Sequence, residues 1–534
     1  MLSATISKVL GAFFKIPLTN LLGGVGMGYF SCAYGLFLPI YALSATGLSA
    51  AVAKLTAEYA AKGCFNSVRR VRNTSRLLFL GLGAVLTLII IFLSKPFAIY
   101  TSGDTSSWYA LLMIAPSALF GCMSAVERGY YEGLQNMYPT AMSQAVEAIV
   151  KVICGLWFSN FVLEHESQVL LFFPNGTDIL SIAAAAAVLG VTVSTVVGLC
   201  YFFFRNLLGG DGFSRSSLCS GNIDSRRHIA KRLMITMLPI TLGSVGATLT
   251  SIIDLCTIMR CIDFSQENNL TALVSRFGDI AKDRAFPAFV YGAFTGMALT
   301  VFNLVPSITN MYGRSVLPCA AYACAKGKIE SLREQVRSVL FAAGLIAVPS
   351  GIGLIMLADP IMLTLYSEHT EEASIAANAL AALSPGMVFI CLVTPLFSIM
   401  QGIGRSDLPV KLMLVGVAVK LLGNLLLIPS PLFTETGAGI STTICYGIML
   451  VMSLISLRHE LKENLGIIKT MLPIVYASLM SGGVVYILKS VLRSYNIIVQ
   501  LAGCISGAVI IYGIVLWLMG HSRKNIREML SLRI

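Results

Sequence analysis

Lysine, glutamate and amide side chains interrupt long apolar runs of this chain at helical spacings. Lys8 and Lys15 are seven residues apart, close to two helical turns, so they share one face of a helix. Gln144, Glu147 and Lys151 follow at spacings of three and four, and Glu147 precedes Lys151 in the favoured order for an ion pair. Since lysine binds phosphate as a point charge, these residues predict a polar, positively charged cavity for an anionic headgroup.

A charge at the centre of a bilayer costs roughly 2.5–3.5 kcal/mol on the insertion scale, so it normally faces a cavity or a partner. On this ground we add Asn303 to the expected cavity, and assign coupling or gating to four further polar residues within apolar runs: Asp254, Arg260, Lys420 and Asn424. A structural interpretation stands beside the functional one. Lys15 could extend to the membrane interface, Lys8 could lie near the surface, and Glu147 with Lys151 could be an ion pair of purely structural value.

The composition requires a lipid environment for these helices. Of 534 residues, 56% are hydrophobic and only 12% are charged, with a mean hydropathy of +0.80. A soluble domain carries about 25% charged residues. Apolar runs of about twenty residues, the length that crosses about 30 Å of hydrocarbon as a helix, recur along the chain. We therefore predict an all-α membrane protein rather than an outer-membrane barrel.

The apolar runs, and the polar, glycine and proline residues that interrupt them, predict about fourteen transmembrane helices. The expected ranges are 2–22, 29–54, 75–100, 108–129, 139–162, 178–204, 232–259, 287–311, 335–358, 374–401, 409–429, 437–457, 467–490 and 495–519.

The connecting segments alternate in charge. Basic residues gather after the second helix, in 205–231, after the eighth helix and in the tail, whereas the intervening loops are acidic or neutral. By the positive-inside rule the basic segments and both termini are cytoplasmic, in a multi-pass protein of the bacterial inner membrane. The net charge of +12 is spread over many short loops, so we expect anionic lipid and no nucleic acid as its partner.

An internal repeat predicts the domain organisation. Ala60-Ala61-Lys62-Gly63 and Cys324-Ala325-Lys326-Gly327 are separated by 264 residues, as are the Ser-x-Arg groups that follow them. The spacing from Gly133 to Pro139 has a weaker counterpart from Gly402 to Pro409. We predict two parallel six-helix lobes, 1–204 and 232–457, joined by a basic cytoplasmic linker, 205–231, and followed by helices 13 and 14 with a tail, 458–534. Parallel repeats are typical of transporters with a substrate site between the lobes.

Motifs for other kinds of chemistry are missing from the sequence. It has no Walker A, HExxH or serine-hydrolase motif, no CxxC pair, and five histidines that do not cluster. We therefore expect no enzyme, no metal and no cofactor. Transport would draw on the membrane potential, H⁺ or Na⁺, or on the substrate gradient.

One stretch resembles a known family. Arg128-Gly129-Tyr130-Tyr131-Glu132-Gly133, continued by Met137, Pro139, Ser143-Gln144, Glu147 and Lys151, resembles the signature of the stage V sporulation protein B group. These are oligosaccharide flippases of the multidrug/oligosaccharidyl-lipid/polysaccharide exporter superfamily. Ser7-Lys8-Val9-Leu10-Gly11 resembles the opening of the lipid II flippases. Lys151 stands where the group usually has arginine, and Glu132 where it usually has glutamine.

The resemblance implies two six-helix lobes with a C-terminal pair, and alternating access around a basic cavity that takes an undecaprenyl-pyrophosphate sugar. Lys8 matches a cavity arginine of the lipid II flippases, whereas their second arginine falls at Phe14, beside Lys15. We expect a monomeric flippase for a lipid-linked cell-wall oligosaccharide, such as the peptidoglycan precursor lipid II, working alone or with cell-wall synthesis proteins in growth or sporulation. A cation-coupled multidrug exporter of the same superfamily and a membrane-embedded enzyme of sugar-lipid metabolism remain alternatives.

Overall fold

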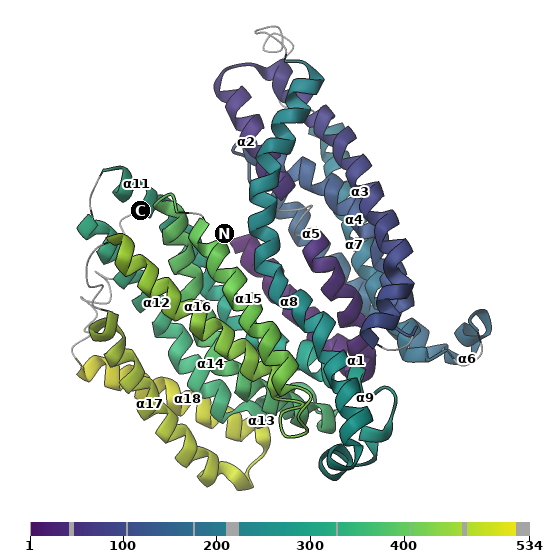
Figure 1. The fold of residues 1–534 in the computed structure, drawn as a ribbon, viewed down its shortest axis with the longest axis vertical. Helices are drawn as coiled ribbons and strands as arrows, with labels where there is room; N and C mark the ends of the chain where they lie inside the picture. The colour runs from purple at the N-terminus through teal and green to yellow at the C-terminus, as the bar shows by residue number, and fades with distance from the viewer. Residues whose placement is uncertain are drawn as a thin grey trace. The chain divides into compact units, whose positions relative to one another are not determined.

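The structure is a computed structural model, and it describes residues 2–41, 47–102, 105–174, 177–209, 224–326, 329–405, 407–461 and 467–519. Within these ranges the chain is helical, with no strand (Figure 1). It divides into two compact units, one formed by Met1–Arg260 with Ala285–Gly292 and the other by Cys261–Arg284 with Ala293–Ile534. The predicted all-α class is confirmed.

The first unit contains the helices α1 (Leu2–Tyr41), α2 (Gly47–Ala61), α3 (Phe65–Ser102), α4 (Trp108–Gly133), α5 (Tyr138–Glu164), α6 (Glu166–Val169), α7 (Ile179–Gly209) and α9 (Phe286–Gly292). The long helix α8 (Arg226–Phe277) begins in this unit and ends in the second. The second unit continues with a π-helical segment (Ala293–Ala298) and with α10 (Leu299–Phe302), α11 (Leu304–Ala325), α12 (Ile329–Met356), α13 (Ala358–Leu365), α14 (Thr370–Gly402), α15 (Asp407–Leu427), α16 (Gly437–Leu461), α17 (Ile467–Val491) and α18 (Ile497–Leu518).

Among the described residues, eleven helices are long and apolar enough to cross a membrane. A bent pair, Thr248–Lys282 with Phe286–Phe302, would make a twelfth span if its two arms count as one. This is a multi-pass membrane protein, but fewer spans are found than the fourteen we expected. One difference is α2, which has fifteen residues and is too short for the roughly twenty that span a bilayer.

The predicted end of the first helix is confirmed, but the gap expected after it is not. We expected helices at 2–22 and 29–54; α1 consists of two helical arms that meet at Gly23, where the backbone is not helical (φ +65°, ψ −173°), and the second arm continues to Tyr41. Glycine adopts this left-handed conformation without the steric cost that other residues incur, so it can interrupt a helix sharply. The two arms therefore meet at a kink of one residue rather than at a loop of several.

Two predicted loops are also helical. The arginines at 69, 70, 72 and 76 lie in the first turns of α3, which begins ten residues before the predicted start. The segment 261–286 is helical as far as Phe277 apart from a kink at Asn269, since α8 extends well past its predicted end at 259. Arginine, glutamine and glutamate in these segments have good helix propensity, and polarity alone did not mark the ends of the helices.

The predicted linker 205–231 is shorter than expected, because α7 extends to Gly209 and α8 begins at Arg226; residues 210–223 lie outside the described residues. Its C-terminal end is tied to the α2–α3 region. The Tyr59 hydroxyl donates to the Asp224 carboxylate, and Arg70 Nη1 donates to the Asp224 carbonyl oxygen at 3.0 Å. Arg232 forms an ion pair with Glu58 at 2.5 Å. Burial, together with the hydrogen bond to Asp224, raises the pKa of Tyr59.

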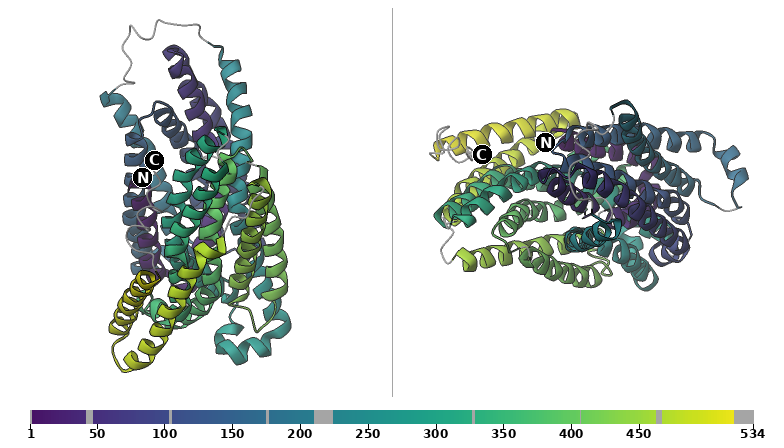
Figure 2. Two further views of the ribbon diagram at one scale, coloured as in Figure 1. Left: turned by 90° about the vertical axis from the view of Figure 1, so that its left-hand side faces the viewer. Right: turned by 90° about the horizontal axis from the view of Figure 1, so that it is seen from above.

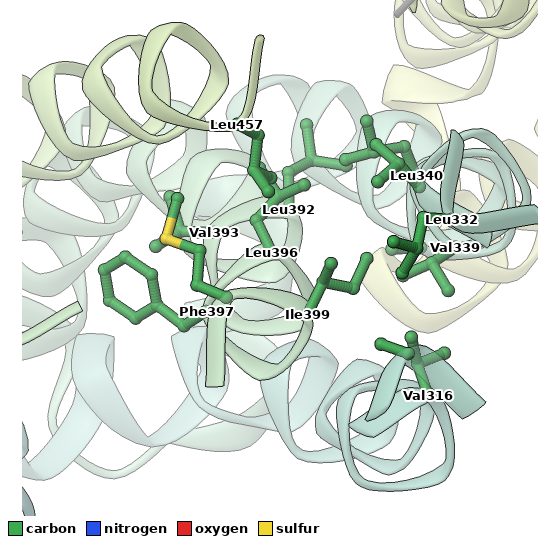
Figure 3. Packing of buried hydrophobic residues seen from close by; sticks show 14 of the residues in the cluster. Val316, Leu332, Val339, Leu340, Leu392, Val393, Leu396, Phe397, Ile399 and Leu457 are labelled. Carbon is green, nitrogen blue, oxygen red and sulfur yellow. The ribbon is translucent and has the colours of Figure 1, made fainter. Parts of the chain in front are cut away.

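The second unit has an extensive apolar core. Buried residues of α11, α12, α14 and α16 meet there, among them Val316, Leu340, Leu396, Ile399 and Leu457 (Figure 3). The helices α17 and α18 lie side by side, with α17 packed on α12 and α18 on α13 (Figure 2). Since lipid is as apolar as these side chains, close packing is what favours helix association here.

In the first unit, α3, α4, α5 and α7 lie alongside one another (Figure 1). A glycine pair on α4 allows α2 to approach closely. A Cβ atom at Gly129 would overlap the Ser49 carbonyl oxygen, and one at Gly133 would lie 2.5 Å from the Ala53 carbonyl oxygen. Small residues four apart let membrane helices pack backbone against backbone, so this part of the sequence motif serves packing.

Replacing Gly133 with valine is therefore expected to lower the stability of the protein by about 1–3 kcal/mol, the usual cost of overpacking. The thermal midpoint of the purified protein in detergent would measure the loss. Gly81→Ala on α3 is the control, because no atom lies within 4 Å of a Cβ built at that position. Equal midpoints for the two variants would contradict this account of the α2–α4 contact.

Candidate functional site

A buried ion pair joins α4 to α5 in the first unit. Arg128 Nη2 lies 2.6 Å from Glu147 Oε1, and the two side chains are only 7% and 16% exposed. Arg128 also donates to the Tyr41 hydroxyl at 3.1 Å and to the Ser143 hydroxyl at 3.3 Å. Glu147 thus lies on the predicted polar stripe of α5, but its partner is Arg128 rather than Lys151.

Glycine on α7 makes room for this pair. A Cβ atom at Gly198 would overlap the carboxylate of Glu147, so the carboxylate lies directly against the α7 backbone. Glu147 pairs with Arg128 and not with Lys151, which was the structural alternative to a cavity role, because Arg128 comes from a neighbouring helix and offers several donors in a planar fork. The pair is close to neutral, which leaves the charge of Lys151 uncompensated by Glu147.

Two lysines supply the positive charge of the candidate site. Lys15 on α1 and Lys151 on α5 are half-buried and close enough to repel one another electrostatically. Lys151 Nζ lies 5.5 Å from the centroid of the Phe14 ring, and Lys15 Nζ lies 6.0 Å from that of Tyr34. Two ammonium groups among aromatic rings favour an anion between or beside them, because its charge removes their mutual repulsion.

The remaining predicted residues of this unit lie in different surroundings. Gln144 is half-buried one turn before Glu147 on α5. Lys8 lies in the opening turns of α1, and its side chain is outside the described residues. Asp254 is 5% exposed on α8 and lies within electrostatic range of the Tyr291 hydroxyl. Arg260 is exposed, with its guanidinium 4.7 Å from the centroid of the Tyr100 ring.

Three predicted residues belong to the second unit. Lys420 and Asn424 are buried one turn apart on α15, and the Ser441 hydroxyl of α16 donates to the Asn424 side-chain oxygen. Asn303 is exposed between α10 and α11, and its amide donates to the Leu299 carbonyl oxygen at 2.7 Å. Asn424 is therefore paired with another polar side chain inside the helix bundle, whereas Asn303 hydrogen-bonds to a backbone carbonyl at the end of α10. The roles given to all these residues remain predictions.

Arg128 was missed as a site residue, as was its neighbour Glu127. Glu127 is 3% exposed and forms ion pairs with Arg72 and Arg76 of α3. Two adjacent charges inside the predicted helix 108–129 were the available signal. Two residues in succession point about 100° apart on a helix, so each needs a partner on a different neighbouring helix. The contact with α3 could not be expected while its arginines were placed in a loop.

The second unit also holds an apolar cavity of about 390 Å³. It lies among α12, α17 and α18, with Ile346, Gly353, Val485, Ile505 and Tyr512 in its lining. A cavity of this composition suits a hydrocarbon chain rather than a sugar.

Two family models match this chain. A family model described as polysaccharide biosynthesis protein matches residues 1–321, and one described as lipid II flippase MurJ matches residues 293–504. The chain is 24% identical to the lipid II flippase MurJ of Bacillus subtilis (strain 168) over 535 residues, which covers 96% of this chain and 93% of that protein. It is 23% identical to stage V sporulation protein B of the same organism over 432 residues, covering 78% and 74%.

A solved structure has the same fold. The lipid II flippase MurJ in an inward closed conformation matches with a TM-score of 0.64 and 15% identity, over 97% of this chain and 98% of that one. Together with the family models and the two relatives, it confirms the resemblance that the motifs in α1, α4 and α5 indicated. The arrangement of two six-helix lobes with a C-terminal pair remains a prediction.

Proposed function

We infer the function of this chain from its membership of the polysaccharide biosynthesis protein family, in which it is a flippase similar to MurJ and stage V sporulation protein B, of the multidrug/oligosaccharidyl-lipid/polysaccharide exporter superfamily. This homology supports a flippase for a lipid-linked sugar. We propose that the sugar is carried on undecaprenyl pyrophosphate, and that the substrate is a peptidoglycan precursor, lipid II. MurJ and stage V sporulation protein B are nearly equally identical to this chain, so sequence identity does not select the substrate. We therefore argue the substrate from the residues of the candidate site.

The observation that carries the proposal is the proximity of Lys15 and Lys151. A pyrophosphate presents two adjacent anionic groups, and two ammonium groups from different helices match this charge. Arg128 does not compete for the substrate, because Glu147 holds it in an ion pair. The sugar would then be bound through its pyrophosphate, the group that all such carriers share, and the glycan would add contacts of its own.

The polyprenyl tail never has to leave a hydrocarbon environment in this mechanism. It would stay in the bilayer while the sugar and pyrophosphate cross. The sugar and pyrophosphate would cross by alternating access of two lobes, as parallel repeats suggest. We propose also that both termini are cytoplasmic, since the basic segments favour that side.

The experiment is a rescue assay. A bacterial host is depleted of its lipid II flippase while this gene is its only replacement, and lipid II accessible on the outer leaflet is measured directly. Restored growth with restored exposure of lipid II would support the proposal. Failure of an abundant, membrane-inserted protein to restore exposure would reject lipid II as the substrate and favour another lipid-linked glycan.

A further inference from the structure

A group of arginines lies near the N-terminal end of α3, and none of them belongs to the candidate substrate site. Arg72 and Arg76 both engage Glu127 of α4: Arg72 Nε donates to Glu127 Oε2 at 3.0 Å, and Arg76 Nε donates to Glu127 Oε1 at 2.6 Å. One carboxylate therefore serves two guanidinium groups. The group keeps a positive charge in a place where the surrounding helices are apolar.

The end of α7 adds a third arginine. The Arg205 guanidinium lies 5.4 Å from the centroid of the Tyr131 ring of α4. The neighbouring Asn206 fixes the position of α7, since its side-chain oxygen accepts from Arg72 Nη2 at 2.7 Å and from the Tyr131 hydroxyl at 2.9 Å. We call Arg72, Arg76 and Arg205, with Glu127, the α3–α7 arginine cluster.

The cluster is open to the outside of the unit. Arg72 is buried, but the Arg76 side chain is 37% exposed and Arg205 is half-buried. Arg76 uses its Nε for Glu127, and among the described residues no acceptor engages its Nη groups. Arg205 likewise has no described acceptor, only the face of Tyr131. Guanidinium groups with free donors at a surface can bind an anionic oxygen in bidentate fashion.

The surface beside the cluster is apolar and exposed. On α3, Leu77 is 71% exposed, and on α7, Phe203 and Phe204 are 63% and 61% exposed. Since both helices are long and apolar enough to span a membrane, we expect these side chains to contact lipid acyl chains. The basic cluster thus borders a surface that faces hydrocarbon.

We propose that the α3–α7 arginine cluster binds the headgroup phosphate of an anionic phospholipid, whose acyl chains lie along the exposed apolar residues of α3 and α7. Glu127 positions Arg72 and Arg76, while Arg76 and Arg205 contact the phosphate. If Glu127 only held helices together, it would not explain why Arg76 and Arg205 keep unused donors next to the exposed apolar surface. The bound lipid is a structural or regulatory partner, separate from the transported one, and the inference does not depend on the proposed substrate.

The test measures lipid binding by the full-length protein in detergent. The apparent affinity for phosphatidylglycerol is obtained from the rise in thermal midpoint on titration, with phosphatidylcholine and inorganic phosphate titrated separately. Phosphatidylglycerol is expected to stabilise the wild type, and the other two to have little effect. Arg76→Gln with Arg205→Gln is expected to weaken the affinity about 30-fold, since each basic residue near the surface contributes about fivefold.

Arg205→Gln alone removes no ion pair, so the fold should survive, and it is expected to weaken binding about fivefold. Lys95→Gln is the matched control: it removes one charge from the same helix, about 28 Å away along its axis, and should leave binding unchanged. Unchanged affinity in the double variant would overturn the proposal. So would equal stabilisation by phosphatidylcholine, which would show a general detergent-replacement effect, or by inorganic phosphate alone, which would show a site for a free anion.

Discussion

Replacing Lys15 and Lys151 together with glutamine is expected to reduce transport of the lipid-linked sugar by about 100-fold or more, because each lysine is lost as a partner of the pyrophosphate and a hydrogen bond to a charged group contributes about 1.5–3 kcal/mol. The substitutions also remove two mutually repelling charges from α1 and α5, so the protein should fold at least as well as the wild type. Exposure of the precursor on the outer leaflet, normalised to the amount of inserted protein, is the measurement.

Two further variants make this prediction specific. Lys15→Arg with Lys151→Arg retains both charges and should retain part of the transport. Lys411→Gln removes an exposed lysine that pairs with Asp407 on α15, and should transport at the wild-type rate. If the double glutamine variant exposed the precursor as fast as the wild type does, the two lysines could not be the pyrophosphate site.

Replacing Glu147 with glutamine is expected to destabilise the protein by about 3–5 kcal/mol, the usual cost of removing one partner from a buried ion pair. The loss arises because Arg128, only 7% exposed, would remain charged between α4 and α5 without its carboxylate. The thermal midpoint in detergent and the yield of monodisperse protein would both fall. Glu330→Gln is the control, since its pair with Arg333 is exposed and surface pairs contribute about 0–1 kcal/mol.

A second substitution separates the lost charge balance from lost packing. Combining Glu147→Met with Arg128→Met removes both charges at similar volume, so much of the stability should return. A Glu147→Gln variant as stable as the wild type would show that the pair contributes little to folding. A double methionine variant as unstable as Glu147→Gln would show that shape rather than charge is responsible.

The helical character of the chain was predictable, because apolar runs of membrane length have few other ways to satisfy their backbone groups. The ends of the helices were less so. The break expected after residue 22 is present at Gly23, but the next helical arm begins at once instead of after a loop, and the arginines before position 77 extend α3 instead of forming a loop. In both places the local sequence permits two conformations, and contacts with other helices determine which one forms.

The candidate site shows the same division. Spacing along α5 placed Gln144, Glu147 and Lys151 on one stripe, since that depends only on helix geometry. The partner of Glu147 depends on which helix packs beside α5, and the spacing of α5 contains no information on that. The motif signalled Arg128 through its resemblance to a family, but its ion pair with Glu147 and the approach of Lys15 to Lys151 required the tertiary structure.

Helix α4 is held on three sides. Its Glu127 pairs with arginines of α3, its Arg128 pairs with Glu147 of α5, and Gly129 and Gly133 pack against the backbone of α2. If α4 rotated about its axis or shifted by one turn, Glu127 or Arg128 would lose its ion-pair partner while still buried, or the α4 backbone would overlap that of α2. The helices α2, α3 and α5 are thus all fixed to α4, and we expect the four to move as one body during transport. The first arm of α1, which ends at Gly23 and carries the lysine that we expect to meet the substrate, meets the second arm at this kink, and the second arm is tied to α4 by the hydrogen bond from Arg128 to Tyr41.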